Sequence, residues 1–196
     1  MGLIVYSCPY VPAELVAAHG LRPSRILPSS TPLSGPVDVS AGVCPYMRGF
    51  VNTACAMTGV AAIVVTTVCD QMRRAVDYIE QRTSFPFFLL NVPSTWQTPG
   101  AMKLYCSELR RLGHFLENVG GEAPAADVLW RIMEEYDGKR ADLAALRGCL
   151  TDVEYSTALA EFNRTGEVRV ASQKAVACKR GVPVAFSESD TAPRPL

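Results

Sequence analysis

The chain lacks an excess of charge of either sign. Its 196 residues contain 19 Lys+Arg and 19 Asp+Glu, so the formal net charge at pH 7 is zero. Proteins that bind nucleic acid attract phosphates with a positive field, and no local cluster of Lys and Arg supplies one here. We therefore do not expect nucleic acid as a partner.

A long hydrophobic run is also missing. The longest apolar stretch, residues 60–68, contains two threonines and is far shorter than the roughly 20 residues that cross a bilayer. Residues 1–10 lack the basic and apolar regions of a secretory signal. The seven cysteines are odd in number and too few for a small disulfide-stapled protein. We expect no membrane association, and a cytoplasmic, reducing location in which thiols are free or bind metal.

Several common catalytic and nucleotide-binding motifs are absent. The sequence contains no Gly-x-Gly-x-x-Gly, no P-loop, no Gly-x-Ser-x-Gly and no His-Glu-x-x-His. No catalytic residue can therefore be assigned from a local motif.

Apolar strand-like segments alternate with amphipathic helical segments in the first part of the chain. The expected strands cover residues 3–6, 25–27, 60–68 and 87–92. The expected helices cover residues 12–19, 45–58, 99–119, 125–136 and 152–163, with one more beginning at Asp70. Alternation over residues 1–92 predicts an α/β fold with a doubly wound parallel sheet of flavodoxin or Rossmann type, and additional C-terminal helices.

Three cysteines occupy equivalent positions in this pattern. Cys8, Cys44 and Cys69 each follow an apolar segment and are each predicted to open a helix. Because the carboxyl ends of parallel strands lie along one edge, where such folds bind ligands, the three thiols should meet there. A helix N-terminus also stabilises a thiolate or an anionic cluster. Their spacing matches no local metal motif, and small buried core side chains stay an alternative.

The other four cysteines differ in their setting. Cys55 lies on the same predicted helix as Cys44 but about 16 Å further along, too far to bind the same small cluster. Cys106 lies in a helix predicted to face the core, and Cys149 and Cys178 lie in the less regular C-terminal third. For all four we expect packed or exposed thiols.

Three ordered segments resemble the 2-hydroxyacyl-CoA dehydratase family. These segments are residues 6–23, 43–49 and 66–74, and each contains one of the three cysteines. The family includes dehydratase D-components, benzoyl-CoA reductase subunits and double-cubane cluster proteins. The resemblance covers roughly residues 3–145 and corresponds to the first α/β domain of that family.

The resemblance implies a specific cofactor and chemistry. Cys8, Cys44 and Cys69 would bind a 4Fe-4S cluster, alone or as part of a larger double cluster. An ATP-dependent activator protein with its own iron-sulfur cluster would deliver a low-potential electron, which reduces an acyl-CoA substrate to a ketyl radical. Joined to a second subunit, the chain would act as a lyase of the 2-hydroxyacyl-CoA dehydratase type or as an acyl-CoA reductase.

The resemblance also sets the expected domain organisation. We predict an iron-sulfur-binding α/β domain over residues 1–150, a C-terminal helical extension over 151–180 and a linker-like tail over 181–196. We expect the second domain of the family to come from outside this sequence, supplied by a second α/β subunit or by a second copy of the chain. Two alternatives are a non-catalytic truncated homologue that keeps the fold and a partner-binding edge, and a thiolate zinc site.

Overall fold

The computed structural model describes residues 1–28, 37 and 42–169. Most of the sequence between residues 28 and 42, the predicted tail over 181–196, and Cys178 lie outside the described residues.

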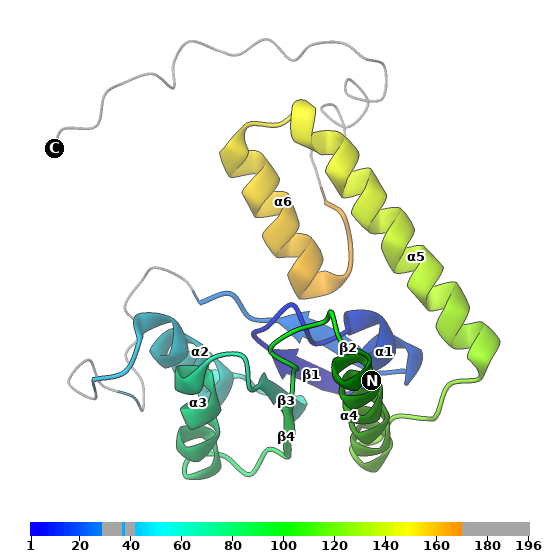
Figure 1. The fold of residues 1–196 in the computed structure, drawn as a ribbon. Helices are drawn as coiled ribbons and strands as arrows, with labels where there is room; N and C mark the ends of the chain where they lie inside the picture. The colour runs from blue at the N-terminus through cyan, green and yellow to red at the C-terminus, as the bar shows by residue number, and fades with distance from the viewer. Residues whose placement is uncertain (29–36, 38–41, 170–196) are drawn as a thin grey trace, which may run out of the picture.

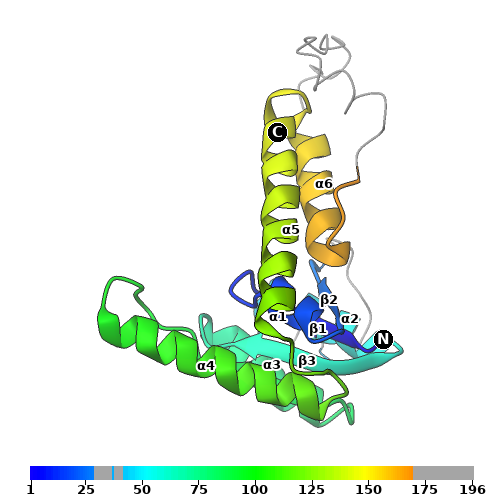
Figure 2. The ribbon, with the colours of Figure 1, turned by 90° about the vertical axis from the view of Figure 1, so that its right-hand side faces the viewer.

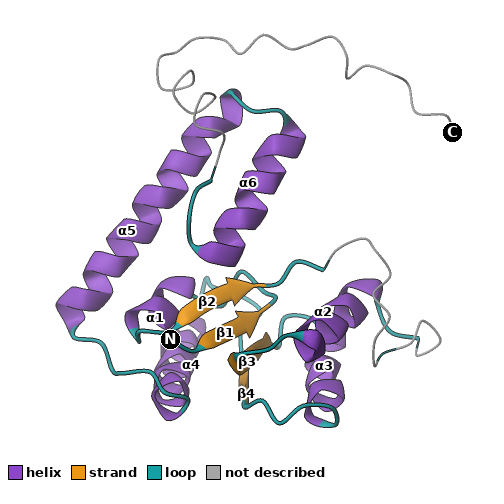
Figure 3. Cartoon of the chain, turned by 180° about the vertical axis from the view of Figure 1, so that it is seen from behind, coloured by secondary structure: helices purple, strands orange, loops and turns teal. Residues whose placement is uncertain are grey.

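The described strands form one parallel sheet. In chain order they are β1 (Leu3–Tyr6), β2 (Arg22–Arg25), β3 (Val60–Thr66) and β4 (Phe87–Leu90). Their order across the sheet is β2-β1-β3-β4, and every pair is parallel (Figure 3). The central strands β1 and β3 are almost entirely buried and apolar, as is typical of a sheet that helices cover on both faces.

Helices lie on both faces of the sheet (Figure 1). The helices α1 (Ala13–Ala18) and α4 (Pro99–Asn118) cover one face, and α2 (Pro45–Ala56) and α3 (Asp70–Glu80) cover the other. This arrangement confirms the predicted doubly wound α/β fold.

Alternating strand side chains build a separate core on each face. Val5 and Ile63 point towards α2 and pack in one cluster with the fully buried Phe50. Ile4 points to the other face and packs in a cluster with Leu112 of α4. Because β-strand side chains alternate in direction, each central strand contributes to both cores.

The second strand differs from the prediction. It covers Arg22–Arg25 instead of residues 25–27. The Arg22 amide donates to the Gly2 carbonyl at 2.9 Å, so pairing with β1 begins directly after the turn that ends α1. Pro23 lowers the strand propensity of this segment because proline has no N–H to donate. An edge strand tolerates proline at a position where the N–H would point away from the sheet.

Two further helices form an antiparallel pair at the β2 side of the sheet (Figure 2). The helix α5 (Ala126–Ala145) is followed by the short 3-10 helix η2 (Leu146–Gly148) and by α6 (Asp152–Thr165). The two long helices share a small core in which the rings of Tyr136 and Phe162 lie 6.2 Å apart. None of the described helices is long and apolar enough to cross a membrane. The predicted boundaries at residues 150 and 180 stay predictions.

Helix α5 is longer than the segment 125–136 that the sequence predicted. It continues through Gly138 to Ala145. An ion pair between Glu135 and Lys139, with 2.7 Å between Oε1 and Nζ, spans the glycine at the favourable i,i+4 spacing. This pair contributes less than the roughly 1 kcal/mol by which glycine lowers helix propensity, so the Arg140–Glu14 ion pair and the burial of Leu143 also support the helix after Gly138.

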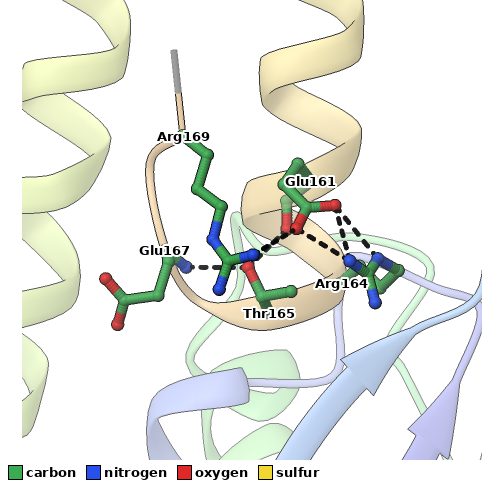
Figure 4. Close-up of polar contacts among 5 residues, drawn as sticks. All are labelled: Glu161, Arg164, Thr165, Glu167 and Arg169. Carbon is green, nitrogen blue, oxygen red and sulfur yellow. Dashed lines mark hydrogen bonds and ion pairs between the residues drawn. The ribbon is translucent and has the colours of Figure 1, made fainter. Parts of the chain in front are cut away.

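The end of α6 is closed by side-chain contacts (Figure 4). Both carboxylate oxygens of Glu161 accept from Arg164, with the shortest distance 2.7 Å, and Arg169 approaches the same carboxylate at 3.6 Å. The Glu167 amide donates to Thr165 Oγ1 at 3.2 Å. Both arginines at this end of the helix thus have a carboxylate partner.

Candidate cysteine site

The three predicted cysteines lie at the carboxyl edge of the sheet. Cys8 follows the end of β1, Cys44 is the N-cap of α2, and Cys69 follows β3 and is the N-cap of α3. This is the edge at which open parallel sheets bind ligands. Cys44 and Cys69 each open a helix, as the sequence predicted, whereas Cys8 lies in the turn between β1 and Pro12, the N-cap of α1.

The segment that carries Cys8 is fixed by backbone contacts. The carbonyl of the buried Ser7 accepts from Arg25 Nε at 2.9 Å and from the Tyr46 hydroxyl at 3.2 Å. The next carbonyl, that of Cys8, accepts from the Val11 amide at 3.2 Å and closes a turn. Because Tyr46 belongs to α2, one of these bonds joins the Cys8 segment to the helix that Cys44 begins.

Cys44 caps its helix and is also joined to the next one. Its Sγ accepts from the Met47 amide at 3.4 Å, which satisfies one of the free N–H groups of the first turn. Its own amide donates to Gln71 Oε1 at 3.3 Å. Gln71 lies in the first turn of α3, so this bond joins the Cys44 segment to the helix that Cys69 begins.

Cys69 makes fewer hydrogen bonds than Cys44 and is more exposed than either of the other two cysteines. Its side chain is exposed and makes no cap hydrogen bond, although its carbonyl accepts from the Arg73 amide at 3.0 Å as α3 starts. The exposed Asp70 and Arg73 side chains approach to 3.6 Å nearby. By contrast, Cys8 and Cys44 are half-buried.

Tyr46 lies within electrostatic reach of two thiols. Burial raises the pKa of its phenol above the ordinary value, while the Arg25 guanidinium opposes that shift; negative charge on Cys8 and on Cys44 would raise the pKa further. Tyr46 therefore stays a neutral hydrogen-bond donor at pH 7, next to groups that become anionic when they bind metal.

The donor chemistry fits an iron-sulfur cluster, since thiolates are the usual cluster ligands. Within residues 1–28, 37 and 42–169, however, no group of three or more His, Cys, Asp or Glu side chains is placed so that it could hold a metal ion. Three ligands of one ion must converge on a single point, whereas each ligand of a cluster binds a different iron atom. The binding of one cluster by Cys8, Cys44 and Cys69 stays a prediction.

The remaining described cysteines lie away from this group. Cys55 packs against the core on the α2 side, and burial raises the pKa of its thiol. Cys106 is exposed and free, so its helix does not turn it to the core. Cys149 is disulfide-bonded, which corrects the expectation of a packed or exposed thiol there.

Sequence reasoning missed the side chains that link the cysteine segments. Tyr46 and Gln71 each lie two residues after a candidate cysteine, and Arg25 ends the edge strand. The repeated Cys-Pro-Tyr at residues 8–10 and 44–46 was the available signal for Tyr46. Nothing in the sequence alone pairs Gln71 with a backbone amide on another helix.

Comparison with known proteins adds one match. The family model described as 2-hydroxyglutaryl-CoA dehydratase, D-component, matches residues 8–174, which include all three candidate cysteines. A search of curated proteins finds no match.

Proposed function

The chain belongs to the 2-hydroxyglutaryl-CoA dehydratase D-component family, and from that premise we propose that it is the iron-sulfur-binding part of a reductive acyl-CoA enzyme. It is a 2-hydroxyacyl-CoA dehydratase-like component. Cys8, Cys44 and Cys69 are the ligands of a 4Fe-4S cluster in this proposal.

The observation that carries the proposal is the chain of hydrogen bonds between the three cysteine segments. Tyr46 joins the Cys8 segment to α2, and Gln71 joins the Cys44 segment to α3. Three segments far apart in sequence are thereby held together at one edge of the sheet. Hydrogen bonds of this kind between segments are expected where several side chains must bind one ligand.

The residues of this chain would orient the ligands and shield them. When bound, the cluster would relay a low-potential electron from an ATP-dependent activator protein to an acyl-CoA. The Ser7 carbonyl, held by two donors, fixes the backbone before Cys8, and the Met47 amide donates to the sulfur of Cys44. N–H donation to a ligand sulfur and partial burial are the means by which a protein tunes such a site.

Anaerobic reconstitution with iron and sulfide tests the proposal directly. The full chain should take up about four irons and four sulfides and develop a broad absorbance near about 400 nm. Each single replacement of Cys8, Cys44 or Cys69 by Ser should lower the iron that the chain retains after desalting by more than about half, because three protein ligands hold the cluster.

Matched Cys→Ser variants provide the control. Cys55→Ser and Cys106→Ser remove a thiol outside the group and should keep the wild-type iron content. Equal iron loss in all five variants would contradict the assignment, as would a chain that binds no iron. Stoichiometric zinc in the purified protein, with no iron uptake after zinc removal, would favour a structural thiolate site instead.

The activity requires further components in this proposal. We infer that a second α/β subunit or a second copy of the chain completes the acyl-CoA site. A reconstituted chain with an intact cluster but no reduction by any activator protein would favour a non-catalytic binding role. Mixing the cluster-loaded chain with candidate subunits and measuring acyl-CoA turnover separates these two outcomes.

A further inference from the structure

A small cavity lies beside the turn that carries Cys8. Its volume is about 290 Å³, at the small end of the range for ligand pockets. The end of β1, the start of α1 and residues of α4, α5 and α6 line it. None of the cysteines lines this cavity, so it is separate from the proposed cluster ligands.

Tyr6 contributes a phenol to one wall of the cavity. Tyr6 is only 3% exposed and lines the cavity, and its hydroxyl makes no hydrogen bond to any described residue. Burial raises the pKa of this phenol far above its ordinary value, so the group is a neutral donor. A phenol that lines a cavity and makes no hydrogen bond to the described residues is able to donate to a ligand there.

A half-buried cation lines the same cavity. Arg25 donates through Nε to the Ser7 carbonyl and interacts with the Tyr46 phenol, both neutral groups. No described carboxylate forms an ion pair with it. At the end of α6, in contrast, Arg164 and Arg169 both have Glu161 as a partner (Figure 4).

The acidic group in the lining is already paired. Both oxygens of Glu14 accept from Arg140 Nη2 at 3.0 Å, and Arg140 also binds Asp137 at 2.8 Å. This arrangement neutralises the negative charge in the wall. The positive charge of Arg25 is therefore the one that the described lining leaves uncompensated.

The lining combines polar and apolar groups, and polar groups provide the larger share of its surface. The apolar part includes Val11, Ala13, Pro23 and Phe162. A guanidinium can bind both oxygens of a carboxylate, the phenol adds a further donor, and the apolar side chains can contact a short hydrocarbon tail. We propose that this cavity binds a short-chain aliphatic carboxylate, with Arg25 as its charge partner and Tyr6 as a hydrogen-bond donor.

Titration calorimetry on the full apo chain, in a buffer free of carboxylates, tests the proposal. Butyrate is the probe, and the neutral isostere butyramide is its matched control. Butyrate should bind saturably and at least about tenfold more tightly than butyramide, because only butyrate carries the charge that Arg25 complements. No cluster is needed, so the result is independent of the proposed function.

Variants at the two polar contacts sharpen the test. Arg25→Gln should weaken butyrate binding at least about tenfold, and Tyr6→Phe should weaken it several-fold. Arg25→Lys keeps the charge and should retain part of the affinity. Arg22→Gln is the control, since Arg22 is an exposed neighbour on β2 that does not line the cavity.

Three results would overturn the proposal. They are equal binding of butyrate and butyramide, wild-type affinity in Tyr6→Phe, and an absence of saturable heat with butyrate. Stronger binding of inorganic phosphate than of butyrate would also refute the choice of ligand. If Arg25→Gln fails to fold, the isostere pair and Tyr6→Phe still decide the outcome.

Discussion

The three cysteine segments at the carboxyl edge of the sheet differ in the number of hydrogen bonds that fix them. At one end, the half-buried Cys8 and Cys44 lie in segments fixed by hydrogen bonds from Arg25, Tyr46 and the Met47 amide. At the other end, Cys69 is exposed and caps α3 without a side-chain bond. Three cysteines at the same edge of the sheet therefore have different environments.

The difference shows that sheet topology determines where the cysteine segments lie, whereas hydrogen bonds determine how firmly each segment is held there. A parallel sheet brings its strand ends to one edge without reference to the side chains there. Fixation needs particular donors, and in the described residues these concentrate around Ser7 and Cys44. We name residues 7–8 and 44–47 the held end and residues 69–73 the open end.

The largest expected effect on stability comes from removing the buried side chain that packs α2 against the sheet. Phe50 is fully buried between α2 and the sheet, so Phe50→Ala should lower the free energy of unfolding by about 3–5 kcal/mol. Urea denaturation measures this loss. Val153→Ala, at a side chain that is 77% exposed, should change stability by less than about 0.5 kcal/mol. A loss below about 1 kcal/mol for Phe50→Ala would show that α2 does not depend on this contact.

Thiol alkylation compares the two ends without mutation. In the apo chain at pH 8, Cys69 should react roughly tenfold faster than Cys44, because it is exposed and Cys44 is half-buried. Cys55 should be slow as well, since its raised pKa leaves less thiolate, and its rate should climb as the pH increases. Peptide mass spectrometry over time measures each rate. Faster reaction of Cys44 than of Cys69 would contradict the comparison.

Loosening the held end through one hydrogen bond should give a smaller effect. Tyr46→Phe removes one of the two donors to the Ser7 carbonyl and should destabilise the chain by about 1 kcal/mol. Alkylation of Cys8 should accelerate while that of Cys69 stays constant. Tyr10→Phe, at a side chain that is 55% exposed, is the matched control and should change neither quantity. Equal acceleration at both cysteines would indicate global instead of local loosening.

The smallest effect is expected where the two ends meet. Gln71→Ala removes the acceptor of the Cys44 amide and should cost about 0.5–1 kcal/mol, since water can reach this half-buried amide in its place. Amide hydrogen exchange at Cys44 should become faster. Gln97→Ala, on an exposed loop, should leave that rate as it is. An unchanged exchange rate in Gln71→Ala would mean that the two helices are not joined in solution.

The sequence predicts the sheet better than the contacts along its edge. The apolar run at 60–68 and the Pro45 helix start are local signals, and both were confirmed. The bounds of β2 and the length of α5 were wrong, because sheet pairing and the tertiary contacts of α5 beyond Gly138 outweigh local propensity. The cysteine positions follow from alternation, whereas the Ser7–Tyr46 and Cys44–Gln71 bonds depend on tertiary placement that no local pattern encodes.

The central position of β1 has a consequence for synthesis of the chain. β1 and β2 lie close in sequence and can pair early, but the other edge of β1 pairs with β3, where Tyr6 lies opposite Val64. Roughly 60 residues separate these partners, so translation at about 5–20 residues per second leaves that edge open for roughly 3–12 s. During that time an apolar strand edge is available to other nascent chains, and we expect chaperones that bind extended segments to recognise it first.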